Sequence, residues 1–338
     1  MLLSIAPLTV FAVDTHSHAM CVDCSTTDGE QLEFTPYDGT LDYTSDANVY
    51  LTEDLVFDST FCVVVSEGAT LNLCLNGYSI IQNDANYYVV FVSPGGTLNI
   101  CDCASGGDNG IRCNGNGGLT NYGSTSLYGI DIKGTGSAVY CTADSTTTLD
   151  SCRIHDCADS AIKTTNDSPK TLNVKNCEIF NNEAYSGAGI YTQSNVTLNV
   201  TNTKLYNNKA SASGGAIYSK KSFVTLDGCE IYGNSAVDLG GSVYFSECVP
   251  TFIDTKIYGN SSSDHGVFID KNAVLAGGVI VISDNVKNGT YNEEKGIYEG
   301  SEALNLRFND QTGYFTVCEE LGVGSKICVD LYTHSITK

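Results

Sequence analysis

Basic residues are scarce in this chain of 338 residues, in which 17 Lys and Arg stand against 39 Asp and Glu, for a formal net charge of −22. No Lys or Arg occurs before Arg112, whereas fifteen Asp and Glu do. So acidic a chain is repelled by phosphate backbones and by anionic lipid headgroups. We therefore expect neither nucleic acid nor an anionic membrane surface among its partners.

Long apolar runs are missing as well. No stretch approaches the roughly 20 consecutive apolar residues that a helix needs to cross a bilayer, so the sequence predicts no membrane span. Tryptophan is absent, whereas glycine reaches 34 residues. Together with abundant Asn, Thr and Ser, this composition favours many tight turns between short strands.

What the chain does contain is a repeat. Between positions 151 and 285 a short motif returns at intervals of about 25–26 residues, a length typical of repeats that stack as coils. Its copies include CEIFNN, TKLYNN, CEIYGN and TKIYGN. The central apolar residues of the copies are Ile154, Ile179, Leu205, Ile231, Ile257 and Ile282. A fixed period indicates a solenoid, in which each repeat is one coil that stacks on the next.

Aligning the copies on the central residue gives columns of distinct chemistry. Two columns are small or apolar and are predicted to line the core. One lies two positions before the centre and contains Cys152, Cys177, Thr203, Cys229 and Thr255. The other lies five positions before it and contains Leu149, Val174, Val200, Leu226 and Phe252. An odd offset of five requires a bend between two strands if both columns point inward.

Two further columns indicate direct stacking of the copies. The residue before the centre alternates in sign, as strands that place opposite charges across a ladder require: Arg153, Glu178, Lys204, Glu230, Lys256. Three positions after the centre, Cys157 is followed by an expected ladder of side-chain amides that cap the turn of each coil: Asn182, Asn208, Asn234, Asn260, Asn285.

A second strand in each repeat follows a glycine-rich turn, in the segments GAGIY, GGAIY and GGSVY. No segment shows a helical period, and the leucine-rich pattern of other repeats of this length is absent. The sequence predicts an all-β, single-stranded parallel β-helix of right hand, as β-crossovers prefer, with coils of about 25–26 residues.

The two ends differ from the repeat. Residues 1–12 are apolar and end in Val-Phe-Ala, which is typical of a secretory signal peptide. Residues 13–49 form a polar segment, residues 50–290 the β-helix, and residues 291–338 a C-terminal β cap or the start of a further module.

One cluster in the N-terminal segment has ligand character. His16, His18, Cys21 and Cys24 could close a tetrahedral zinc site, although a disulfide or plain thiols fit the same spacing. Such a zinc ion would be structural, and no other cofactor is expected. The fifteen cysteines are an odd number, and Cys152 with Cys177 could be a disulfide or a pair of buried thiols.

The repeat resembles a known group. GGAI at residues 214–217 and IFNN at residues 179–182 resemble the G-G-A-I and F-x-x-N motifs of repeats of the polymorphic outer-membrane protein type. Over residues 50–285 the chain is similar to bacterial secreted or surface proteins with right-handed parallel β-helix repeats. The resemblance implies the fold and an exported location. It leaves activity open, because such coils also serve lyases, hydrolases, adhesins and stalks.

One alternative is an enzyme, either a polysaccharide lyase or a polygalacturonase-like hydrolase that works in a groove on the solenoid side. Hydrolysis needs two carboxyl groups at a controlled separation. The densest candidates are Asp144, Asp150, His155, Asp156 and Asp159, with Asp167 nearby. Acidic residues are also common in solvated turns, so the sequence favours a non-catalytic chain.

The other alternative is a binding surface. Two outward aromatic columns are expected, which we call the first aromatic column (Phe180, Tyr206, Tyr232, Tyr258) and the second aromatic column (Tyr191, Tyr218, Tyr244, Phe268). Repeated rings suit contact with sugar rings or a partner surface, and they also stabilise their own ladder. We expect an exported, adhesin-like or carbohydrate-contacting β-helix at the cell surface or secreted, with a polysaccharide or cell-surface glycan as partner and a structural stalk as a further alternative.

Overall fold

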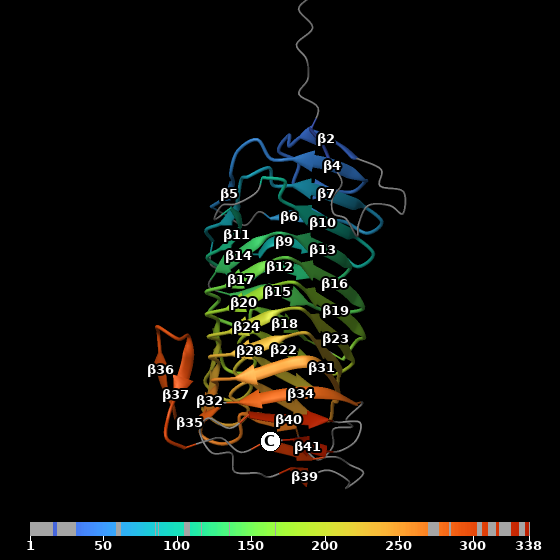
Figure 1. The fold of residues 1–338 in the computed structure, drawn as a ribbon. Helices are drawn as coiled ribbons and strands as arrows, with labels where there is room; N and C mark the ends of the chain where they lie inside the picture. Colours follow the sequence, from blue (N-terminus) through green and yellow to red (C-terminus); the bar gives the residue numbers. More distant parts are fainter. Residues whose placement is uncertain are drawn as a thin grey trace, which may run out of the picture.

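Short strands stacked in a single pile make up the molecule (Figure 1). The computed structural model describes residues 16–18, 32–58, 62–84, 86, 88–104, 109–115, 117–134, 136–165, 167–269, 277–283, 285–302, 306–309, 316–317, 326–330 and 335–337. Within these residues there is no helix, and the strands of successive coils pair in parallel. The chain is therefore a parallel β-solenoid, which confirms the predicted fold class.

Each coil contributes strands to three faces. The first face contains β2 (Leu32–Pro36), β4 (Ala47–Tyr50), β7 (Thr70–Cys74), β10 (Thr97–Cys101), β13 (Ser124–Tyr128), β16 (Ser145–Asp150), β19 (Lys170–Lys175), β23 (Val196–Thr201), β27 (Phe223–Asp227), β31 (Val249–Tyr258) and β34 (Gly277–Ser283).

The second face follows directly in the chain and consists mostly of three-residue strands. It contains β5 (Leu55–Phe57), β8 (Ile80–Gln82), β11 (Gly110–Cys113), β14 (Asp131–Gly134), β17 (Arg153–His155), β20 (Glu178–Phe180), β24 (Lys204–Tyr206) and β28 (Glu230–Tyr232), and it continues into β31 and β34. The two faces form one hydrogen-bonded sheet because β31 and β34 run through both.

The third face closes the coil. It contains β3 (Asp42–Tyr43), β6 (Val63–Val65), β9 (Tyr88–Val92), β12 (Gly117–Asn121), β15 (Ser137–Cys141), β18 (Ile162–Thr164), β22 (Ile190–Gln193), β26 (Ile217–Lys220), β30 (Val243–Ser246) and β33 (Val267–Ile269). Between the second and third faces, a ladder of two-residue strands contains β21 (Glu183–Ala184), β25 (Lys209–Ala210), β29 (Ser235–Ala236), β32 (Ser261–Ser262) and β35 (Val286–Lys287).

A left-handed residue makes the bend between the first and second faces. Ser151, Asn176 and Asn202 have φ of 55°, 53° and 48°, in the region that Asn tolerates because its short polar side chain bonds locally. The bend allows residues five apart, such as Leu149 and Ile154, to point inward together, and both are fully buried. The odd offset between the two inward columns thus has the predicted cause.

The central inward column extends further toward the N-terminus than the repeat indicated. Ile154 pairs with Ile132, Ile132 with Ile111, and Ile111 with Ile80. The steps between these residues along the chain are unequal and depart from the regular period. Parallel stacking is present even before residue 50, since Thr35 of β2 pairs with Val49 of β4. The regular period therefore describes the coils from Ile154 onward.

The C-terminal strands change direction. β40 (Lys326–Asp330) pairs antiparallel with β34, and β41 (Ser335–Thr337) pairs antiparallel with β40. On the third face, β38 (Leu306–Asn309) adds in parallel to β33 and pairs antiparallel with β39 (Thr316–Val317). Antiparallel strands thus follow the last parallel strand on both faces at this end. β36 (Thr290–Asn292) and β37 (Ile297–Glu299) form a hairpin beside the stack (Figure 1).

Candidate functional site

The asparagine column forms a continuous buried ladder. The amide of Asn182 donates to Oδ1 of Asn208 at 2.9 Å, and Asn208 donates to Asn234 at 3.0 Å. Asn234 donates to Asn260 at 3.0 Å and Asn260 to Asn285 at 2.8 Å. The same amides also donate to backbone carbonyls of the preceding coil, such as that of Leu205. Because side chains and backbone are satisfied together, this column holds the coils in register.

The column of Cys and Thr is also inward and serves the backbone. The hydroxyl of Thr255 donates to the carbonyl of Leu226 at 3.0 Å, and the thiol of Cys229 donates to that of Val200 at 3.3 Å. The hydroxyl and the thiol therefore make the same kind of hydrogen bond at this bend, which explains why either Thr or Cys occupies this position in different coils. Cys152 and Cys177 are thiols rather than a disulfide.

Both aromatic columns are stacked ring on ring. In the first column the ring centroids lie 4.8 Å apart for Phe180 and Tyr206 and 5.1 Å for Tyr206 and Tyr232, with interplanar angles of 1° and 4°. The second column has the same geometry, as at Tyr218 and Tyr244, 4.8 Å apart. Each ring face is thus covered by its neighbour, as cross-strand stacking requires. A ligand alongside would meet ring edges and hydroxyl groups.

The column of alternating charge lies beside the first aromatic column. Arg153 contacts Glu178 at 3.7 Å, and Lys256 contacts Glu230 at 3.3 Å. Pairing of Asp131 with Arg153 adds one more acidic member upstream. Because these side chains are mostly half-exposed, each pair contributes about 0–1 kcal/mol. The alternating charges favour the observed pairing of each coil with the next one, since a shift of one coil would place like charges opposite each other.

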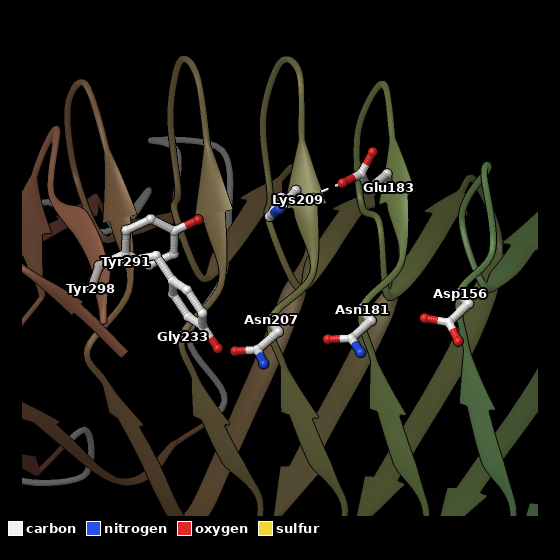
Figure 2. A pocket seen from close by; sticks show the side chains of 8 residues that line it. All are labelled: Asp156, Asn181, Glu183, Asn207, Lys209, Gly233, Tyr291 and Tyr298. Atoms are coloured by element: carbon white, nitrogen blue, oxygen red, sulfur yellow. Dashed lines mark ion pairs between the residues drawn. The ribbon is translucent and has the colours of Figure 1, made fainter. Parts of the chain in front are cut away.

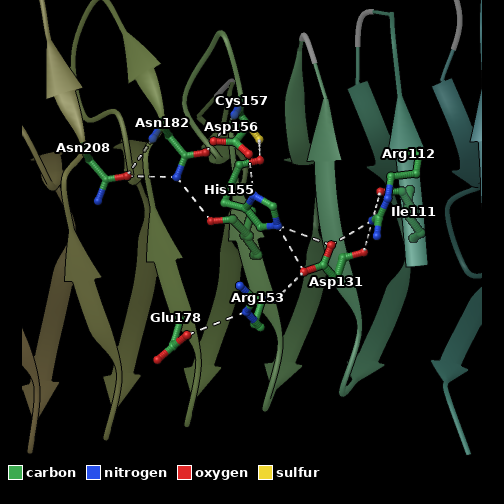
Figure 3. Close-up of polar contacts among 11 residues, drawn as sticks. Ile111, Arg112, Asp131, Arg153, His155, Asp156, Cys157, Glu178, Asn182 and Asn208 are labelled. Atoms are coloured by element: carbon green, nitrogen blue, oxygen red, sulfur yellow. Dashed lines mark hydrogen bonds and ion pairs between the residues drawn. The ribbon is translucent and has the colours of Figure 1, made fainter. Parts of the chain in front are cut away.

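At the upstream end of both columns, two guanidinium groups and an imidazole converge on Asp131 (Figure 3). Arg112 contacts the carboxylate at 2.9 Å, Arg153 at 3.1 Å and Nε2 of His155 at 3.1 Å. Nδ1 of His155 contacts Asp156 at 2.7 Å, and its ring stacks on Phe180 at 4.7 Å. We call Arg112, Asp131, Arg153, His155 and Asp156 the charged cluster. It ends the first aromatic column with an imidazole ring.

The charged cluster shifts the protonation of its own members. The hydrogen bond to Asp131 raises the pKa of His155, against the opposing effect of burial, and the bond to Asp156 adds to the rise. Burial alone would raise the pKa of Asp131, but the hydrogen bond from His155 and the charges of His155 and Arg112 lower the pKa overall. The carboxylate of Asp131 is therefore held ionised, and the imidazole is held toward its protonated form.

Of the predicted catalytic residues, only His155 and Asp156 lie together. Asp150 accepts hydrogen bonds from Asn176 at 2.9 Å and from Ser151 at 3.0 Å, and it supports the bend. Asp159 pairs with Lys163 at 2.6 Å. Asp144 and Asp167 are exposed. Among the described residues, no ion pair or hydrogen bond joins these four carboxyl groups to His155.

Arg112 and Asp131 are not among the residues that the sequence predicts for a functional site. Both residues belong to coils whose length differs from the regular period of about 25–26 residues. The repeat pattern that begins at Ile154 therefore does not extend to them. One pattern in the sequence does indicate Asp131. If the column of alternating charge continues by one copy upstream of Arg153, its next member is an acidic residue directly before an apolar one, and Asp131 precedes Ile132. Arg112 lies in a different column, one position after its central residue Ile111, where it pairs with Lys133.

Two of the four predicted zinc ligands fall outside the described residues. His16 and His18 lie in β1 (His16–His18), whose backbone pairs antiparallel with β2. Cys21 and Cys24 are outside the described part of the chain, as is the expected signal peptide of residues 1–12. The zinc site stays a prediction. In the described residues, no group of three or more His, Cys, Asp or Glu is arranged to hold a metal ion.

Stacked parallel coils with inward amide and apolar columns define the chain as a β-helix solenoid protein. A family model described as the right handed beta helix region matches residues 58–210, in agreement with the fold. Comparisons with curated proteins and with solved structures gave no match. In the part of the chain that the structure describes, no helix is long and apolar enough to cross a membrane.

Proposed function

We propose that this chain is an exported β-helix, secreted or at the cell surface, that binds a polysaccharide or a cell-surface glycan without cleaving it. The observation that carries the proposal is the pair of aromatic columns. Their rings repeat every 4.8–5.2 Å along the stack. A regular, elongated surface of this kind suits an elongated ligand.

The stacked geometry specifies the kind of contact. With ring faces covered, Tyr206, Tyr232 and Tyr258 offer edges and phenol groups. Burial raises the pKa of Tyr206 to about 12, and burial likewise raises the pKa of Tyr232 and of Tyr258. These phenols stay protonated at neutral pH, so each can donate and accept hydrogen bonds with sugar hydroxyl groups.

Among the described residues, the charged cluster favours the enzymatic alternative, because it gathers two carboxylates, an imidazole and two guanidinium groups. Two properties speak against catalysis there. The carboxyl group of Asp131 has a lowered pKa and is therefore a poor proton donor. Its oxygens are engaged by Arg112, Arg153 and His155, which is typical of a structural ion network.

A screen of the purified chain against polysaccharides tests the proposal. Retention should occur without release of reducing or unsaturated sugar ends. Release of such ends would instead establish a hydrolase or a lyase, and absence of any retention would favour a structural stalk.

Two matched triple variants assign the contact. Replacing Tyr206, Tyr232 and Tyr258 by Phe keeps the stack and removes the hydroxyls, as Phe180 does naturally in the same column. This variant should fold as the wild type and lose most of the retention. The corresponding Ser variant should lose retention and also stability, by roughly 0.2–1 kcal/mol per lost ring pair. Undiminished retention by both folded variants would refute the first aromatic column as the contact surface.

A further inference from the structure

The hairpin of β36 and β37 is docked on the coils through two glycines. A row of left-handed residues follows the second face, in which Asp156, Asn181 and Asn207 have φ of 54°, 55° and 56°. In the next two coils the same position is Gly233 and Gly259. A Cβ atom at Gly233 would lie 2.3 Å from the carbonyl oxygen of Gly296, and one at Gly259 would lie 2.6 Å from Ile297. The exchange of Asn for Gly in the repeat thus makes room for the hairpin.

Hydrogen bonds hold the hairpin in this place. The amide of Tyr298 donates to the carbonyl of Gly259 at 2.9 Å, and its hydroxyl donates to Ser235 at 3.0 Å. Tyr291 of the opposite strand packs on Tyr298, with ring centroids 5.2 Å apart. The docked hairpin therefore presents two aromatic rings beside the row of Asn side chains.

A pocket of about 270 Å³ lies where the hairpin meets that row (Figure 2). Its lining combines aromatic, amide and charged groups: Asp156, Asn181, Glu183, Asn207, Lys209, Gly233, Tyr291 and Tyr298. Figure 2 shows the three side chains of the row on successive coils, with the tyrosines at one end and Glu183 with Lys209 along the other wall. The volume is near the lower end of the roughly 300–1,000 Å³ of ligand pockets.

One acceptor in this pocket is unsatisfied. The Asn207 side chain hydrogen-bonds the phenol of Tyr291, but its Oδ1 is buried and has no hydrogen-bond partner among the described residues. A buried acceptor without a donor is costly, and a donor group of a bound molecule would remove that cost. The charges in the pocket, by contrast, are balanced. Glu183 contacts Lys209 at 3.5 Å, and Asp156 contacts His155, whose pKa is raised. A neutral ligand with hydroxyl donors fits this set better than an ion does.

We propose that this pocket binds a neutral saccharide unit, with the amides of Asn181 and Asn207 as its hydrogen-bonding groups and the hairpin tyrosines as its apolar wall. Such a combination of a few polar groups with aromatic rings is what sugar recognition requires. This inference deepens the proposed glycan binding, since the pocket would hold one unit of a chain that runs along the coils.

The test uses the full chain and neutral disaccharides, namely cellobiose, maltose and N,N′-diacetylchitobiose, with binding measured by titration calorimetry and by NMR. Digalacturonate and the glucosamine dimer serve as charged probes. At least one neutral disaccharide should bind with millimolar or tighter affinity, and the charged probes should bind more weakly. No binding by any neutral probe, or tighter binding by a charged one, would overturn the proposal.

Two variants locate the site. Asn207→Gly and Asn181→Gly remove the amides while keeping a residue that accepts the left-handed conformation, as Gly233 does in the same row. Each should weaken disaccharide binding by about tenfold, the effect of one lost hydrogen bond. Asn202→Gly is the matched control, because Asn202 makes the preceding left-handed bend and does not line this pocket. The control should bind as the wild type.

The outcomes separate this inference from the proposed function. Asn181 lies one coil further from the hairpin than Asn207 (Figure 2), so a loss in Asn181→Gly is not explained by a loosened hairpin. Equal affinity in all three glycine variants would place any disaccharide elsewhere and overturn the pocket, even where polysaccharide retention still depends on Tyr206, Tyr232 and Tyr258. Conversely, disaccharide binding that depends on Asn207, without retention by the aromatic column, would support the pocket alone.

Discussion

The coils before Ile154 and the coils that follow it differ in the backbone conformation directly after the second strand. In the upstream coils the second strand stays extended for two more positions, so that Gln82 and Cys113 point inward and are buried. In the downstream coils a left-handed residue, first Asp156, follows the strand and moves the next inward position from two to three residues after the centre. Because side chains alternate along an extended strand, one such residue exchanges the inner and outer faces.

The consequence is seen in a single column. Asn83 and Asn114, three positions after Ile80 and Ile111, form an exposed amide contact of 3.0 Å. Downstream the equivalent Asn234 is fully buried within the ladder. The same residue type at the same offset is thus a surface contact in one region and a core element in the other, depending on one backbone conformation.

The outward column shows a second contrast. The position after the centre is Arg112, Lys133 and His155 upstream, and it is aromatic from Phe180 to Tyr258. His155 belongs to both regions, since it pairs with Asp131 and stacks on Phe180. The upstream coils are therefore held by a compact ion network at this position, and the downstream coils by stacked rings.

The largest effect is expected in the upstream network. Asp131→Asn keeps the shape of the side chain and removes the carboxylate charge that contacts Arg112, whose side chain is only 13% exposed. The free energy of unfolding should fall by about 3 kcal/mol, near the lower limit for a broken buried ion pair. Urea unfolding measures this change.

The control for that measurement is Glu178→Gln, which removes a half-exposed partner of Arg153. It should cost no more than about 1 kcal/mol. If the two substitutions lower the free energy of unfolding equally, the charged cluster is as solvated as the rest of the column of alternating charge.

A smaller effect is expected from the downstream ladder. Asn234→Ala removes an amide that donates to Leu205, Tyr232 and Asn260 and that accepts from Asn208. Leaving these groups unsatisfied should lower the free energy of unfolding by about 1–3 kcal/mol. Thermal and urea unfolding would both report it.

Asn114→Ala tests the contrast with the upstream coils, because Asn114 occupies the equivalent position at their surface. Its cost should stay within about 0.5 kcal/mol. If both Asn234→Ala and Asn114→Ala leave the unfolding curve unchanged, the asparagine ladder does not stabilise the register of the downstream coils.

The smallest effect is expected from pH. The raised pKa of His155 means that its stabilising contribution is complete below the unfolded value of about 6.5 and is lost as pH rises through the folded value. Asp131, whose pKa is lowered, contributes above its unfolded value of about 3.9 and loses that contribution as pH falls through the folded value. The charged cluster should thus be strongest between these two pH values.

The measurement compares the urea midpoints of wild type and His155→Gln at about pH 5.5 and about pH 8.5, on either side of the ordinary value for His. The difference between the two proteins should shrink at the higher pH. A difference that grows with pH would show that His155 is neutral in the folded chain.

Much of the downstream half could be predicted from the sequence. The period, the two inward columns and the bend between them follow from side-chain chemistry that repeats at a fixed interval. The charged cluster could not be located in the same way. Asp131 lies 22 residues before Arg153 and Arg112 a further 19 before Asp131, so a regular period does not align them.

The parallel stack follows from the amino-acid sequence, because each short repeat has an apolar side that a similar neighbouring repeat covers. Which outward residues meet, by contrast, depends on how the coils are placed in the folded chain. The convergence of two Arg and a His on Asp131 depends on coils of unequal length. The pocket beside Asn207 depends on a hairpin much further along the chain, which reaches the stack because Gly233 and Gly259 leave space for its backbone.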